Sequence, residues 1–128
     1  MEIIDGKFLS KIILEKLKNS ENLTLAIIKI SGNEASDIYV RKKIKACEDV
    51  GIKVLLQEIK ISESFHLEDE IIEIIDTLNI DNSITGIIVQ LPLPSFLDKE
   101  KILTRIFPRK DVDGLTPYNR GKIMENPY

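Results

Sequence analysis

The stretch Gly86-Ile87-Ile88-Val89-Gln90-Leu91-Pro92-Leu93-Pro94 predicts a buried strand that ends abruptly. Four apolar residues in a row are typical of a strand that is covered on both faces. Proline cannot donate a hydrogen bond to a neighbouring strand, so Pro92 ends the ladder and the chain must turn. Gln90 therefore stands at the turn, where its side-chain amide offers both a donor and an acceptor.

Outward from this strand, helix and strand patterns alternate along the chain. Strands are predicted at residues 25–30, 52–59 and 84–89, and helices at 7–17, 35–50, 67–78 and 99–107. Gly51 suits the left-handed residue after a helix, Pro108 stops the last helix, and Val112 begins a short strand or an extended turn. Strands separated by helices imply right-handed crossovers. The predicted fold is therefore a three-layer α/β/α arrangement with a short, mostly parallel sheet.

This topology predicts where a ligand would bind. In parallel sheets covered by helices, ligands sit beyond the carboxyl ends of the strands. Ser31-Gly32-Asn33 follows the first predicted strand and Gln90-Leu91-Pro92 follows the third. Both segments are therefore expected at one edge of the sheet.

Tyr39 and Lys43 are one turn apart on the predicted helix and share a face. Lys43 can act as a base only when it is neutral, which partial burial and the nearby cations Arg41, Lys42 and Lys45 favour. From spacing alone, a solvated basic helix face is the more usual explanation of the same residues. The Tyr-x-x-x-Lys spacing also occurs in short-chain dehydrogenases, but those need a glycine-rich phosphate loop, and the six glycines here are scattered singly.

Asp111 and Asp113 flank Val112 in a loop that Gly114 allows to turn. Alternate residues of an extended chain face the same way, so one site could receive both carboxylates. A carboxylate binds two adjacent N–H donors, and the amino-pyrimidinone edge of a pterin offers such a pair. Two alternatives stay open: the aspartates form only the turn, and the amide of Gln90 satisfies only loop backbone.

Composition narrows the class of protein. A chain of 128 residues is most simply one domain, and its net charge of −3 gives no footprint for nucleic acid. No apolar run approaches the ~20 residues of a membrane span, and the start of the chain lacks a secretory signal, so the cytoplasm is expected. Cys47 is interpreted as a small core residue and His66 as a surface residue. No Cys/His or carboxylate cluster has metal-ligand spacing, so no metal is expected.

Several motifs appear in one order over nearly the whole chain. They are Ala35-Ser36, Tyr39-Val40, Lys43-Ile44-Lys45-Ala46, Gly51-Ile52, Leu78-Asn79, Gly86 to Pro94, Pro108 to Gly114 and Asn119-Arg120-Gly121. Together they resemble the bifunctional methylenetetrahydrofolate dehydrogenase/methenyltetrahydrofolate cyclohydrolase family. Asn33-Glu34 departs from the Asp-Pro or Asn-Pro that the family usually has before Ala-Ser.

The resemblance implies a tetrahydrofolate-binding catalytic domain over residues 1–128, the amino-terminal domain of the amino-acid-dehydrogenase-like type. Lys43 then corresponds to the catalytic lysine, Tyr39 to its partner over the folate ring, and Gln90 to the glutamine that contacts the lysine. Asp113 corresponds to the carboxylate that holds the pterin. The substrate-binding residues implied are Tyr39, Gln90, Leu91, Pro92 and Asp113.

The resemblance also implies an activity and its cofactor. The parent enzyme, a homodimer by the same resemblance, oxidises 5,10-methylenetetrahydrofolate with NADP and hydrolyses 5,10-methenyltetrahydrofolate to the 10-formyl form. The family binds NADP in a carboxy-terminal Rossmann domain, whose glycine-rich fingerprint this sequence lacks. We therefore expect no cofactor-binding residues here and no hydride transfer by this chain alone.

Two other functions are open at this stage. The chain could be a non-catalytic module that holds a folate, or an interaction domain with a decayed site. The presence of Tyr39, Lys43, Gln90 and Asp113 argues against decay. A folate titration beside a cyclohydrolase assay separates the binding module from the enzyme.

Overall fold

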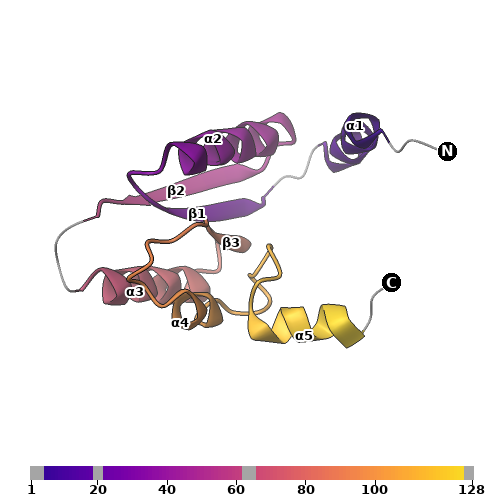
Figure 1. Cartoon of the computed structure of the whole chain (residues 1–128). Coiled ribbons are helices and arrows are strands. Elements are labelled where there is room, and N and C mark those ends of the chain that lie inside the picture. Colours follow the sequence, from indigo (N-terminus) through magenta and orange to yellow (C-terminus); the bar gives the residue numbers. More distant parts are fainter. Residues whose placement is uncertain (1–4, 19–21, 62–65, 126–128) are drawn as a thin grey trace.

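The structure, a computed structural model, describes residues 5–18, 22–61 and 66–125. The first seven helices and strands follow one another as predicted, and one further helix comes after them (Figure 1). The elements are α1 Gly6–Leu17, β1 Thr24–Ile30, α2 Glu34–Asp49, β2 Lys53–Ile59, α3 Leu67–Ile80, β3 Gly86–Val89, α4 Lys99–Thr104 and α5 Pro117–Glu125. In this part of the chain no helix is long and apolar enough to cross a membrane.

The three strands form one parallel sheet in the order β2-β1-β3. The central strand β1 sets Leu25 opposite both Val54 of β2 and Gly86 of β3. Figure 1 shows α2 over one face of the sheet and α3 with α4 under the other, while α1 stands apart from these layers. The predicted three-layer α/β fold is confirmed.

Alternation along the strands divides the core into two clusters. The larger cluster fills the face under α3 and α4 and includes Ile28, Ile71, Ile75, Ile87 and Ile102, none of them exposed. The smaller cluster, on the α2 face, consists of Ile27, Val40 and Ile88, with half-buried apolar neighbours. Successive strand residues point to opposite faces, so Ile87 and Ile88 belong to different clusters.

Three predicted boundaries differ from the structure by two or more residues, and one of them is the end of α3, which reaches Ile80 instead of residue 78. The third strand begins at Gly86 rather than residue 84, because Ile84 closes a turn by donating its backbone N–H to the carbonyl of Asp81. The helix predicted to reach residue 107 ends at Thr104. Beyond it, Ile106 donates to Leu103 in a tighter i→i−3 bond, which is common where a helix ends.

Helix α5 was not predicted. It begins at Pro117, directly after Thr116, whose hydroxyl accepts the N–H of Asn119. Threonine at the cap and proline in the first turn form a standard helix start, so the signal was present in the sequence. Val112, expected to begin a strand or an extended turn, follows a single parallel bridge between Asp111 and Ile87.

Candidate functional site

A hydrogen bond joins α2 to the end of β3. Nζ of Lys43 donates to Oε1 of Gln90 over 3.1 Å. Gln90 is only 8% exposed, and its backbone N–H donates to the carbonyl of Ile28 in β1. Its side-chain Nε2 donates to the carbonyl of Leu91 over 2.7 Å. The amide is therefore oriented with its oxygen toward the lysine.

The start of helix α2 is fixed by its cap. Asn33 accepts the N–H of Ser36 over 2.9 Å, and Gly51 takes the positive φ of +84° predicted after the helix. Asn33-Glu34, which replaces the Asp-Pro or Asn-Pro usual in the family, therefore still begins the helix normally, with Asn33 as the cap.

The α2 lysines differ in their surroundings. Lys43 is half-buried, whereas Lys42 and Lys45 are exposed. Tyr39 lies one turn before Lys43 and is 59% exposed, so its ring is available to a ligand. Of the three lysines, Lys43 is the one whose hydrogen bond reaches the end of the sheet.

The turn after β3 brings two more expected residues beside Gln90. The Leu91-Pro92 peptide bond is cis. Leu91 is half-buried and Pro92 is exposed. Both therefore lie at the carboxyl end of the sheet, where the topology predicted a binding site.

The two aspartates of the 111–113 loop do not share a site. Asp111 is buried and its carboxylate accepts three hydrogen bonds, from the N–H groups of Leu115 and Thr116 and from Nδ2 of Asn119. Burial, the largest single influence, raises the pKa of Asp111, but these donors together outweigh it and lower the pKa. The expectation that both carboxylates could face one ligand is wrong, because the chain turns back at Gly114 and Asp111 organises that turn.

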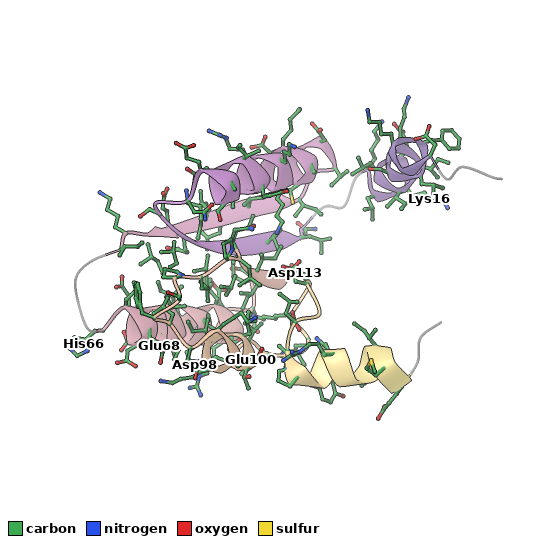
Figure 2. The ribbon with its side chains drawn as sticks, in the orientation of Figure 1. Lys16, His66, Glu68, Asp98, Glu100 and Asp113 are labelled. Atoms are coloured by element: carbon green, nitrogen blue, oxygen red, sulfur yellow. The ribbon has the colours of Figure 1, made fainter. Side chains whose placement is uncertain are left out.

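Asp113 is the exposed carboxylate of the pair. Figure 2 shows it on the loop that precedes α5. The bridge between Ile87 and Asp111 is parallel, so Gln90 and Asp113 both lie beyond it in the same chain direction. Asp113 is thus the carboxylate of this loop left available to a ligand.

Buried contacts hold this loop against the sheet. Lys110 is 6% exposed and donates to the carbonyls of Leu78 and Asp81 at the end of α3. Burial lowers the pKa of the Lys110 ammonium. Gly86 allows the loop to approach, because a Cβ at this position would stand 2.5 Å from Cγ1 of Val112.

Sequence reasoning missed three buried polar residues near these elements: Lys29, Ser36 and Lys110. The hydroxyl of Ser36 has no hydrogen-bond partner among the described residues. It lies one turn before Tyr39 on α2, and its oxygen is shielded from solvent. The available sequence signal for Ser36 was its position, one helical turn before the Tyr of the Tyr-x-x-x-Lys pair.

The remaining candidates carry no chemistry of their own. His66 is exposed, as predicted. Cys47 is half-buried rather than fully buried, and burial raises the pKa of its thiol, which disfavours the reactive thiolate. Within residues 5–18, 22–61 and 66–125, no group of three or more His, Cys, Asp or Glu side chains could hold a metal ion.

The family described as tetrahydrofolate dehydrogenase/cyclohydrolase, catalytic domain, matches residues 4–113. The chain belongs to this family. The match includes Tyr39, Lys43, Gln90 and Asp113, and it confirms the resemblance seen in the sequence motifs.

Individual curated relatives support the same family membership. The bifunctional protein FolD of Agathobacter rectalis is 42% identical over 132 residues, which cover 95% of this chain and 46% of that protein. FolD of Rickettsia rickettsii is 51% identical over 130 residues, covering 94% of this chain and 44% of that protein. The chain therefore spans slightly under half the length of these relatives.

Solved structures share the fold. The bifunctional FolD of Campylobacter jejuni has a TM-score of 0.86 and 42% identity, covering 93% of this chain and 44% of that one. The FolD of Trypanosoma brucei, solved with an NADP cofactor and an inhibitor, has a TM-score of 0.85 and 29% identity, covering 95% of this chain and 43% of that one. The layered arrangement is thus that of the catalytic domain of a folate enzyme family.

Proposed function

We propose that residues 1–128 form the tetrahydrofolate-binding catalytic domain of an enzyme that hydrolyses 5,10-methenyltetrahydrofolate to 10-formyltetrahydrofolate. The parent activity also includes oxidation of 5,10-methylenetetrahydrofolate with NADP, in one-carbon metabolism that supplies purine biosynthesis. The observation that carries the proposal is the 3.1 Å hydrogen bond between Lys43 and Gln90 at the carboxyl edge of the sheet. It supports the proposal because ligands of this fold class bind at that edge of the sheet, where the amine of Lys43 could act as a base.

In the proposed hydrolysis, Lys43 acts as a general base. The methenyl carbon is an electrophilic cation, which a neighbouring ammonium would repel, so the lysine works in its neutral form. Its nitrogen removes a proton from water while the water oxygen bonds to the methenyl carbon. The carbinol oxygen then loses its remaining proton as it forms the C=O bond, the bond from that carbon to N5 breaks, and N5 gains a proton. The formyl group stays on N10, and one proton is released overall. Gln90 keeps Lys43 in place through its side-chain oxygen.

Other residues are proposed to hold the substrate. Tyr39 covers the folate ring, and Asp113 accepts the paired N–H donors of the pterin edge, a charge-assisted arrangement. Leu91 and Pro92, beside Gln90, form the wall where the chain turns. The exposure of Tyr39, Pro92 and Asp113 supports this, because each can reach a ligand without unfolding the core.

NADP is assigned to a part of the enzyme outside this domain. A dinucleotide needs a cradle of closely spaced glycines at a helix start. The glycines with positive φ here are Gly32, Gly51 and Gly114, and each belongs to a separate turn. These residues do not fit the cofactor, so no step of the proposed chemistry is routed through it.

We also propose that the enzyme is a cytoplasmic homodimer. Among the described strands, β2 lies at the edge of the sheet, and its apolar Leu55 and Leu56 are exposed. An apolar edge strand is a surface that a second copy can cover. Equilibrium sedimentation over a range of concentrations tests this assembly.

The function is tested with Lys43→Met and the matched control Lys45→Met. Loss of a general base typically lowers a rate by about 100- to 10,000-fold, whereas exposed Lys45 pairs with Asp49 on the surface and should matter little. Hydrolysis is followed by the absorbance of 5,10-methenyltetrahydrofolate, and binding of a folate by calorimetry. Near-normal hydrolysis by Lys43→Met contradicts the proposal. Tight folate binding by wild-type protein that shows no turnover favours the non-catalytic binding module.

A further inference from the structure

A buried lysine, Lys29, lies beneath helix α2 and takes no part in the proposed hydrolysis. Lys29, near the carboxyl end of β1, is only 7% exposed. Two residues earlier on the same side of the strand, Ile27 packs with Val40 of α2. The alternation of the strand therefore places Lys29 on the α2 side of the sheet. A charged group in such a place needs partners.

Its two partners come from different elements. Nζ of Lys29 lies 2.5 Å from Oδ1 of Asp37, in the first turns of α2, and 2.9 Å from Oε1 of Glu58. Glu58 is the residue directly opposite Lys29 in the pairing of β1 with β2. These hydrogen bonds, with Asp37 first and Glu58 second, raise the pKa of Lys29 and keep it charged. One ammonium thus ties a helix to two strands.

The link to α2 constrains the orientation of the helix. The hydrophobic contact among Ile27, Val40 and Ile88 is non-directional, so it specifies the rotation of α2 less sharply than a directional bond does. An ion pair with a short hydrogen bond is directional. Asp37 precedes Tyr39 by two residues and Lys43 by six, close enough for the rotation of one to set the others.

We propose that Lys29 is a positioning residue, which holds Asp37 and thereby sets α2 so that Lys43 faces Gln90. The inference rests on the proposed function of Lys43. A purely stabilising role for the same ion pairs is the alternative. The two differ in what they predict for the two partners, since only Asp37 belongs to the helix that carries Lys43.

The partners supply a matched pair of variants, Asp37→Asn and Glu58→Gln. Each variant replaces one of the two carboxylates that pair with the Lys29 ammonium by a neutral amide. Both replaced side chains are partly exposed, so both variants should fold. We expect Asp37→Asn to lower the kcat of hydrolysis about tenfold with KM little changed, because small misplacements of a catalytic group lower rates strongly. Glu58→Gln should stay within about twofold of wild type on both constants.

A second measurement on the same full chain does not depend on turnover. Hydrogen exchange of backbone amides in residues 37–43 should be faster in Asp37→Asn than in wild type and unchanged in Glu58→Gln. Lys29→Met, which nearly keeps the length of the side chain, should have the same effect on exchange and kcat as Asp37→Asn. The double variant Lys29→Met/Asp37→Asn should lower kcat no further than either single variant.

Equal effects of Asp37→Asn and Glu58→Gln on kcat and on exchange would overturn the positioning role and leave a stabilising one. Failure of the proposed function looks different. If wild type and Lys43→Met hydrolyse the substrate equally, the base assignment falls, while unequal exchange in the two variants still supports the link from Lys29 to α2. Equal exchange overturns the inference whatever the activity.

Discussion

The two faces of the sheet are built differently. The face under α3 and α4 carries a continuous apolar cluster, in which Ile71, Ile75 and Ile87 are fully buried. The face under α2 has an apolar cluster of three buried residues, and beside it lie the buried polar side chains of Lys29 and Ser36. The same three strands thus hold the fold together on one side and support candidate chemistry on the other.

This difference shows how a small domain separates stability from reactivity. The α3 side excludes water from a large surface, which stabilises the fold in proportion to its apolar area. On the α2 side, Lys43 is paired with Gln90, and Lys29 is paired with Asp37 and Glu58. Polar groups in specific pairs hold defined positions, which a reactive site requires.

Ile87→Ala and Ile88→Ala test the comparison most directly, because these neighbours on β3 point to opposite faces. Ile87→Ala should lower the free energy of unfolding by about 3–5 kcal/mol, and Ile88→Ala by about 2 kcal/mol, since the smaller cluster leaves a smaller cavity. Urea unfolding measures both. Ile88→Ala should nevertheless reduce hydrolysis more than Ile87→Ala, because it lies under α2. The reverse order in stability would break the comparison.

Gln90→Glu sharpens the comparison within the polar side. A carboxylate about 3 Å from Lys43 would favour the charged form of the lysine, which cannot act as a base. Hydrolysis should fall by about 100-fold. The thermal midpoint should also fall, because a carboxylate oxygen replaces the Nε2 group that donates to the carbonyl of Leu91, and two acceptors then face each other in a buried place. Steady-state kinetics measures the effect on hydrolysis, and thermal melting measures the effect on the midpoint. Gln57→Glu on β2 is a control away from the site.

Asp111→Asn should make stability less dependent on pH. The pKa of Asp111 is lowered in the folded chain, so its stabilisation is present above the unfolded value of about 4 and is lost as pH falls through the folded value. We expect wild type to lose stability below about pH 4 by this route. The variant should be about 1.5–2 kcal/mol less stable at neutral pH. Urea unfolding at pH 3 and pH 7 gives both numbers, and equal losses at both pH values would contradict the role of the charge.

The smallest effect is expected at the start of α2. Asn33→Ala removes the cap that accepts the N–H of Ser36 and should lower stability by about 1 kcal/mol. Asn33→Asp should retain the cap. If the Ala variant loses hydrolysis while Asn33→Asp keeps it, the first turn of α2 also positions the site.

The parts of the fold that repeat a period could be predicted from the sequence. The apolar spacing of Val40, Ile44 and Cys47, with Gly51 after it, was sufficient to place α2 within one residue at each end. The weakly amphipathic α5 offered no such period, and its start at Thr116-Pro117 was overlooked. The apolar period therefore located the helices that carry one, including α1, and missed the helix that lacks it.

The candidate site was predictable only in part. Lys43 and Gln90 could be proposed from local patterns and the family motifs, and the structure brings them together. Which of Asp111 and Asp113 faces outward could not be decided, because it depends on amides of Leu115 and Thr116 that come into reach only after the chain turns. The burial of Lys29 was equally invisible, since its partners Asp37 and Glu58 come from other elements.

Helix α1 stands apart from the layers in Figure 1, and none of its residues is buried. A helix of 12 residues is marginal in water without tertiary support. Its apolar Phe8 and Ile13 are exposed, and Lys16, labelled in Figure 2, lies in its last turn. α1 should therefore open by local unfolding while the sheet stays closed. A protease that cuts after lysine should nick the chain within residues 6–17 long before it digests the rest.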